Sequence, residues 1–179
     1  EGNPYDRTYD FQGYQIYQLR DSEVSAGDLE DPELARLLLQ VDIEDFDESG
    51  EPIGQIINYE FDEQIGLSVP REKVNGQNAG IIHSFEVTDD LFAQGDNRLI
   101  NFKKYYYMAV AYGYNMYEPY NPDPDNPTGQ ASPYLVGRSS ATGAINPVVA
   151  IPSKPDPRTF GTVANSSYGD GLPITRIEG

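Results

Sequence analysis

The chain of 179 residues contains no cysteine and no tryptophan, and it has a single histidine. Without cysteine it can form no disulfide, offer no thiolate nucleophile and bind no cysteine-ligated zinc. A single histidine gives no support to a transition-metal site either. No apolar run approaches the ~20 residues that cross a bilayer, and the first residues lack the basic and apolar regions of a signal peptide. We therefore expect no direct membrane insertion.

Basic side chains are also scarce, since 12 lysines and arginines stand against 29 aspartates and glutamates, for a net charge of −17. Residues 1–70 hold 18 of these acids and only 3 of the basic side chains. Such a surface repels phosphates, which argues against nucleic acid as a partner. It also disfavours docking on anionic membranes. The acidic side chains form either a solvated face that favours solubility or a cation-binding site, and the sequence leaves both interpretations open.

The composition favours an all-β fold. Only 38% of the residues are hydrophobic, and 14 prolines with 17 glycines indicate many turns between short strands. The length suits one domain with a flanking segment. We expect the domain to span residues 1–151. Residues 152–179, which open with Pro152, Pro155 and Pro157, are expected to form a stiff linker toward a following domain.

Residues 103–114 predict one long central strand. Alternation places Tyr105, Tyr107, Ala109 and Ala111 on one face, and Tyr106, Met108, Val110 and Tyr112 on the other. Leu99 stands six residues before Tyr105, a spacing typical of a tyrosine at the start of a sandwich strand that is anchored on the preceding corner.

Other segments show weaker strand patterns. Residues 37–43 and 53–61 alternate on either side of an acidic turn and predict a β-hairpin. The remaining expectations are a strand at 11–19, a short helical turn from Asp31, a loop at 64–80, a strand at 81–87 that carries His83, a long loop at 115–129, and strands at 133–139 and 146–151.

These pieces resemble a fibronectin type III domain, an immunoglobulin-like β-sandwich, over roughly residues 9–151. Gly13-Tyr14-Gln15-Ile16-Tyr17 resembles its C strand, and the run from Leu99 through Tyr105 to Ala111 resembles its F strand. The resemblance implies first strands that are missing before Phe11. An incomplete sandwich exposes a sheet edge, so we expect another segment or chain to complete the sheet.

The chain is also similar to segments of large secreted or surface proteins of Bacteroidota that are cargo of type IX secretion. The similar residues are Gly13–Tyr17, Gly95–Ile100, Tyr105–Tyr107 and the tail from Tyr168 to Gly179. This resemblance implies an extracellular or cell-surface location and a non-catalytic role in a multidomain assembly. The expected partners are other segments or chains of that assembly.

One acidic turn is a candidate cation site. Asp45, Asp47 and Ser49 supply oxygens at alternate positions, and a glycine stands at the sixth, as in the first half of a calcium loop. The twelfth position is Ile56 where such a loop needs glutamate. The alternative is therefore an acidic turn without metal. Calcium is the one cofactor that the sequence suggests.

Fourteen tyrosines suggest a glycan-binding module as an alternative function. Tyr112, Tyr114, Tyr117 and Tyr120 run from the central strand into the following loop, and a tyrosine ring can pack on a sugar while its hydroxyl forms hydrogen bonds. The competing interpretation is sheet packing and an exposed loop.

The sequence contains no motif that indicates catalysis. No nucleophile-elbow motif accompanies the histidine, and a glycosidase pair needs two acids ~5 to 9 Å apart, which a sequence does not reveal. We expect a structural or protein-interaction module that is not an enzyme. The alternatives are the glycan-binding module and an accessory fragment of a secreted enzyme.

Overall fold

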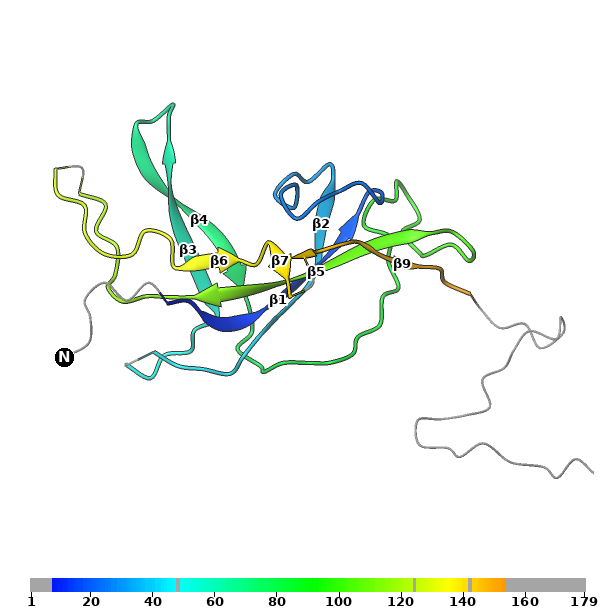
Figure 1. The fold of residues 1–179 in the computed structure, drawn as a ribbon, viewed down its shortest axis with the longest axis horizontal. Helices are drawn as coiled ribbons and strands as arrows, with labels where there is room; N and C mark the ends of the chain where they lie inside the picture. The colour runs from blue at the N-terminus through cyan, green and yellow to red at the C-terminus, as the bar shows by residue number, and fades with distance from the viewer. Residues whose placement is uncertain (1–7, 48, 124, 142, 154–179) are drawn as a thin grey trace, which may run out of the picture.

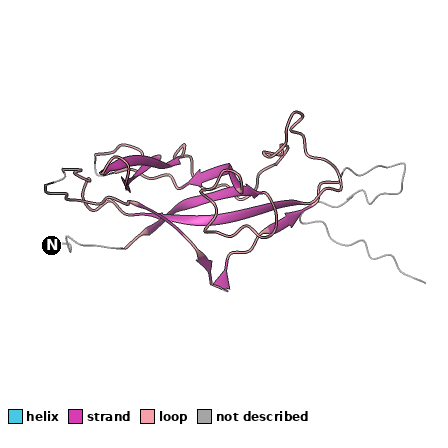
Figure 2. Cartoon of the chain, turned by 90° about the horizontal axis from the view of Figure 1, so that it is seen from above, coloured by secondary structure: helices cyan, strands magenta, loops and turns pink. Residues whose placement is uncertain are grey.

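The computed structural model describes residues 8–47, 49–123, 125–141 and 143–153 and shows an all-β fold. Strands and loops make up the described residues, with no helix among them (Figure 2). The strands are β1 (Asp10–Leu19), β2 (Ala35–Asp42), β3 (Gln55–Asp62), β4 (Leu67–Asn75), β5 (Tyr105–Tyr114), β6 (Tyr134–Val136), β7 (Ser139–Ser140), β8 (Gly143–Ala144) and β9 (Val148–Ala150). The predicted fold class is confirmed.

The main sheet is antiparallel and has the order β2-β1-β5-β6, with β9 pairing beside β6 along β5. Its two long strands, β1 and β5, cross the middle of the molecule (Figure 1). Gln15 lies opposite Val110 on β5 and Gln40 on β2, which fixes the register. The predicted strands at 11–19 and 103–114 are confirmed, as are those near 133–139 and 146–151.

The two faces of β5 differ as the alternation predicts. Met108, Val110 and Tyr112 are at most 2% exposed, whereas Ala109 and Ala111 between them are exposed. Because successive strand side chains point to opposite faces, the sheet has a buried inner face and a second face that is only partly covered.

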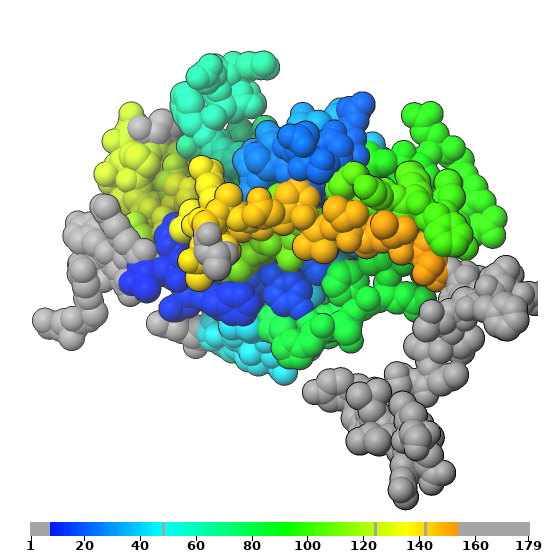
Figure 3. All heavy atoms as spheres, turned by 45° about the vertical axis from the view of Figure 1, so that its right-hand side comes forward, coloured from blue at the N-terminus to red at the C-terminus, as the bar shows by residue number. Residues whose placement is uncertain are grey.

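Two segments of the chain cover the inner face. The loop 20–34 packs Val24 and Leu29 against Met108, and the hairpin of β3 and β4 packs Ile56 and Val74 against Tyr112. In Figure 1 both lie above β1 and β5, while the connection from β4 to β5 first runs below them and then rises to the start of β5. The space-filling view shows the loop and the hairpin side by side (Figure 3).

The predicted pairing of residues 37–43 with 53–61 is wrong. Both segments are strands, but β2 pairs with β1, and β3 pairs with β4 across a turn that ends at Gly66. Gly66 has a φ of +72°, a conformation that glycine adopts at little cost. Alternation identifies a strand but not its neighbour, and the hairpin that the structure has is formed by β3 and β4.

The predictions for residues 64–87 are also wrong. Residues 64–80, expected as a loop, contain β4, in which Pro70 pairs with Tyr59. A proline fits there because β4 is an edge strand, which pairs with β3 on one side only and needs no backbone N–H donors on the other. Residues 81–87 form no strand, and His83 is exposed. The expected helical turn is one turn in which the backbone N–H of Ala35 donates to the Asp31 carbonyl (2.9 Å).

Tyr105 is anchored on the corner before β5, as its spacing from Leu99 predicts. Its hydroxyl accepts a hydrogen bond from the backbone N–H of Ile100 (2.8 Å), and its ring is 3% exposed. The Lys103 amine lies over the same ring, with Nζ 4.8 Å from the ring centroid, and forms a cation–π contact. The start of the central strand is therefore fixed by contacts with the preceding loop.

Candidate functional site

The acidic turn around Asp47 is held by hydrogen bonds of its own. Asp47 Oδ1 accepts from the Ser49 backbone (2.8 Å), the Ser49 hydroxyl (2.7 Å) and the Glu51 backbone (2.9 Å). The bond from the Ser49 hydroxyl is the largest cause of a lowered pKa at Asp47, followed by the bond from the Glu51 backbone. This pattern is an Asx turn, in which aspartate closes a tight bend.

Asp45 has other partners, since its Oδ1 accepts from Gln12 Nε2 (2.9 Å). Burial, partly offset by the bond from Gln12, raises the pKa of this carboxyl. Among the described residues there is no group of three or more histidines, cysteines, aspartates or glutamates that could hold a metal ion. Calcium bound by Asp45, Asp47 and Ser49 stays a prediction. Equal melting temperatures in chelator and in millimolar calcium would remove it.

The four candidate glycan-contacting tyrosines lie in different environments. Tyr112 is 2% exposed and packs against Tyr134 with ring centroids 5.5 Å apart, while Tyr114 is half-buried beside it. Tyr117 is 41% exposed and donates to the Gly129 carbonyl (3.2 Å). Tyr120 lies 4.8 Å from the Tyr59 ring. Glycan contact through this segment stays a prediction.

A polar cleft of about 570 Å³ lies where the loop 20–34 faces the β3–β4 hairpin across the inner face of the sheet. We call it the Lys73 cleft and define it by Tyr17, Glu30, Glu60, Lys73, Tyr134 and Arg138. Its walls come from segments far apart in the sequence.

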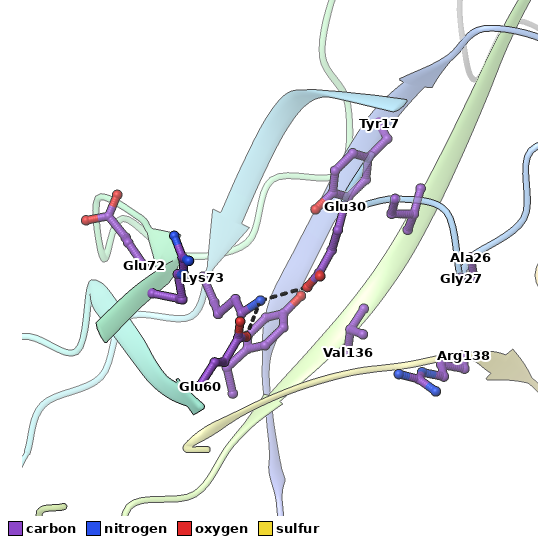
Figure 4. Close-up of a pocket in the computed structure, with 12 residues that line it drawn as sticks. Tyr17, Ala26, Gly27, Glu30, Glu60, Glu72, Lys73, Val136 and Arg138 are labelled. Atoms are coloured by element: carbon purple, nitrogen blue, oxygen red, sulfur yellow. Dashed lines mark hydrogen bonds and ion pairs between the residues drawn. The ribbon is translucent and has the colours of Figure 1, made fainter. Parts of the chain in front are cut away.

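Lys73 is the most constrained charge in the cleft. Its side chain is 15% exposed, and Nζ donates to Glu30 Oε1 (2.7 Å) and to Glu60 Oε1 (2.6 Å). In Figure 4 the amine points at both carboxylates, and Arg138 lies across the cleft from Glu72. Burial alone would lower the pKa of Lys73, but the bonds to Glu30 and Glu60 outweigh it and raise the pKa. The lysine is therefore a mostly buried cation between two carboxylates whose side chains are 81% (Glu30) and 44% (Glu60) exposed.

Gln15 holds the floor of the cleft in place. Its Oε1 accepts from the hydroxyls of Tyr134 (2.8 Å) and Tyr17 (3.1 Å), and its Nε2 donates to Gln40 Oε1 and to the Lys73 carbonyl (both 3.0 Å). Gln15 is 1% exposed. One buried amide thus positions both aromatic rings and the strand that carries Lys73.

The Lys73 cleft was missed at the sequence level because residues 64–80 read as a loop. The signal that could have found it is the turn Asp62–Gly66 directly after a strand pattern, which indicates a hairpin and hence a further strand. Even so, the approach of Glu30 to Lys73 depends on tertiary packing that no local pattern contains.

The second feature is the outer face of the sheet, which we call the open face and define by Phe11, Ala109, Ala111, Leu135 and Val148. Phe11 and Leu135 both lie opposite Gly113 in the register, and Val148 lies opposite Tyr107, so all five share one face. Phe11 is 51%, Leu135 52% and Val148 65% exposed. An apolar stripe with no charged member therefore faces solvent along β5.

The other half of this face is covered by the connection between β4 and β5. Gln18 Nε2 donates to Asp90 Oδ1 (2.7 Å), and Arg36 donates to the Leu91 carbonyl (2.6 Å) with its guanidinium 4.6 Å from the Phe92 ring centroid. Tyr14 donates to the Ile82 carbonyl. The cover ends before Ala109 and Ala111.

Comparisons of the chain with protein-family models, with curated proteins and with solved structures give no match. In the described part of the chain, no helix has the length and hydropathy needed to cross a membrane.

Proposed function

We propose that this chain is a non-catalytic structural and protein-interaction module, built as a fibronectin type III-like sandwich, of an exported multidomain surface protein. Its partners are other segments or chains of the same assembly, and its location is extracellular or at the cell surface. The resemblance of Gly13–Tyr17 and of the tail from Tyr168 to Gly179 to surface proteins of Bacteroidota that use type IX secretion supports the export of the parent protein.

The sheet order supports the sandwich. An immunoglobulin-like domain has one sheet in which strands C′, C, F and G are neighbours, and β2, β1, β5 and β6 stand in that order here. The Tyr105 hydroxyl bonded to the preceding corner matches the tyrosine of the F strand in that fold.

The open face is the observation that carries the interaction role. In a sandwich, a second sheet packs ~10 Å away on this side, but among the described residues only the connection through Asp90 and Phe92 lies there. Exposed contiguous apolar surface marks an interaction site more often than chance allows. The fitting occupant is an apolar β-layer supplied by another segment or chain of the assembly.

Cysteine labelling tests this proposal, because the chain has no cysteine of its own. Ala111→Cys places one thiol on the open face, and Gln64→Cys places one at the exposed tip of the β3–β4 hairpin as a matched control. A membrane-impermeant maleimide is applied to the isolated chain and to intact cells that produce the parent protein.

We expect Ala111→Cys to react quickly in the isolated chain and to be protected in cells, while Gln64→Cys reacts in both. Equal reactivity of Ala111→Cys in the two settings would show that nothing covers the open face. An unreactive Gln64→Cys in intact cells would exclude the surface location.

A further inference from the structure

The Lys73 cleft has the size and shape of a small-molecule site. Its volume of about 570 Å³ lies within the ~300–1,000 Å³ range of ligand pockets in proteins. The cleft opens beside the inner face, whereas the open face lies on the other side of the sheet, so a ligand here would not compete with the proposed protein partner.

The charges in the cleft balance. Three carboxylates, Glu30, Glu60 and Glu72, and three basic groups, Arg71, Lys73 and Arg138, line the cleft. Glu30 and Glu60 face Lys73, and Arg138 extends from the opposite wall (Figure 4). This balance is unusual in a chain whose net charge is −17. An anionic ligand would meet the carboxylates, and a cationic ligand would meet the basic groups. A neutral ligand rich in hydroxyl groups can donate to the carboxylates and accept from the basic groups.

The Lys73 amine and the two tyrosine hydroxyls are held in position before any ligand arrives, while Glu30 and Glu60 extend to solvent with 81% and 44% of their side chains exposed. Lys73 Nζ uses Oε1 of each glutamate, which leaves the Oε2 atoms outside these ion pairs. Gln15 fixes the hydroxyls of Tyr17 and Tyr134. Groups that are already ordered lose little entropy when they bind, and hydrogen bonds to charged groups are the stronger ones.

Apolar walls complete the site. Leu29, Val136 and the rings of Tyr17 and Tyr134 line the cleft beside the charges. A pyranose ring presents C–H groups on its faces and hydroxyls around its rim. Its faces can therefore pack on such walls while its hydroxyls form hydrogen bonds with the charged side chains.

We propose that the Lys73 cleft binds a short neutral oligosaccharide, with Glu30 and Glu60 accepting from sugar hydroxyls and Lys73 and Arg138 donating to them. This assigns sugar recognition to the cleft between the loop 20–34 and the β3–β4 hairpin, apart from the tyrosines of residues 112–120. The inference does not depend on the proposed protein-interaction role.

Calorimetric titration of the chain tests it with cellotetraose, xylotetraose and mannotetraose as neutral probes. Trigalacturonate serves as the anionic probe and a glucosamine tetramer as the cationic one. We expect at least one neutral probe to bind more tightly than both charged probes. Glu60→Gln and Arg138→Ala change exposed or partly exposed side chains, so both variants should fold, and each should weaken that binding about tenfold.

Glu63→Gln, at the nearby hairpin tip, and Arg98→Ala, on the far loop, are matched controls and should leave binding unchanged. The proposal is overturned if no neutral probe binds, if a charged probe binds more tightly, or if the two cleft variants bind as wild type does. Loss of binding in Tyr117→Ala or Tyr120→Ala alone would place the sugar on the loop and equally overturn it.

Discussion

At the scale of single residues, Gln15 is the polar side chain that links the strands and tyrosine rings of the inner face by hydrogen bonds. It satisfies two tyrosine hydroxyls, the Gln40 side chain and the Lys73 carbonyl at a site that is 1% exposed. Removing one member of a buried polar network leaves its partners unpaired in a low dielectric. The network therefore couples the core of the sheet to the walls of the Lys73 cleft.

The first prediction concerns Gln15→Leu, which keeps the side-chain size and removes both the acceptor and the donor. We expect the free energy of unfolding to fall by about 2 kcal/mol, because the Gln40 side chain and the Lys73 carbonyl lose a buried partner and two hydroxyls at the cleft lose their acceptor. Urea unfolding followed by circular dichroism measures the loss. Gln64→Leu, on an exposed turn, is the control and should change stability by less than about 0.5 kcal/mol. A loss below about 1 kcal/mol in Gln15→Leu would contradict the central role of this network.

The second prediction concerns Tyr105→Phe. Removing the hydroxyl leaves the Ile100 backbone N–H without its acceptor, so the free energy of unfolding should fall by about 1 kcal/mol. Hydrogen exchange should be faster at Ile100 than in the wild type. Tyr106→Phe removes a hydroxyl from the next residue on the other face and is the matched control. Unchanged exchange at Ile100 would mean that the corner is held by other contacts.

At the scale of elements, the connection between β4 and β5 is fastened to the sheet chiefly through Asp90. This aspartate is 5% exposed and accepts from Gln18 on β1 (2.7 Å), from the Phe92 backbone (3.0 Å) and from Lys103 (2.8 Å). Burial alone would raise the pKa of Asp90, but these bonds outweigh it and lower the pKa below its ordinary value of 3.8. The connection covers its half of the outer face because this carboxylate stays ionised.

The third prediction follows from that lowered pKa. A carboxyl whose pKa is lower in the folded state stabilises the fold above its unfolded pKa, and this stabilisation is lost as the pH falls through the folded pKa. Asp90→Asn should lower the free energy of unfolding by about 2 kcal/mol at pH ~7. The difference from wild type should shrink at pH values below about 3.8.

Urea unfolding at neutral and at acid pH measures both parts of this prediction. Asp96→Asn is the control, because Asp96 pairs with Arg98 on the exposed surface and such pairs contribute little. If wild type and Asp90→Asn differ in free energy of unfolding by the same amount at neutral and at acid pH, the charge of Asp90 is not what holds the connection on the sheet.

The elements show which parts of the fold could be predicted from the sequence. The long strands β1 and β5 were found because alternation and tyrosine-rich composition extend over ten residues in each. The same alternation separates Met108 and Val110 from Ala109 and Ala111, although it does not say which of the two faces is buried. Strand pairing could not be predicted in the same way, because β2 and β3 carry equivalent patterns and the choice between neighbours is made by the loops that join them.

The candidate sites were harder to predict than the strands. Asp47 and Ser49 do lie together, because they belong to one turn. Glu30 and Lys73 meet across 43 positions of the chain, and a contact of that separation leaves no local signal. Pro70 further concealed β4, since proline is typical of loops and is tolerated only at sheet edges.

At the scale of the whole molecule, charge is distributed very unevenly. Residues 1–70 carry 18 acids and 3 basic side chains, and they include β1, β2 and β3 together with the loop 20–34. A net charge far from zero destabilises the compact state through self-repulsion. Ion pairs with exposed partners contribute little to stability, and in the two pairs of Lys73 the side chains of Glu30 and Glu60 are 81% and 44% exposed. Screening should therefore relieve repulsion more than it weakens attraction.

The last prediction is that salt stabilises this protein. Raising sodium chloride from about 0.01 M to about 0.15 M shortens the screening length from ~30 Å to ~8 Å, and the melting temperature should rise. A variant with Glu33→Gln, Glu44→Gln and Glu63→Gln, three exposed acids, lowers the negative charge by three and should show a higher melting temperature at low salt and a smaller rise. Differential scanning calorimetry at matched protein concentration measures both. A melting temperature that falls with salt would mean that exposed ion pairs such as Asp96–Arg98 outweigh the repulsion, and the acidic half of the chain would then need a bound cation or a basic partner to explain its charge.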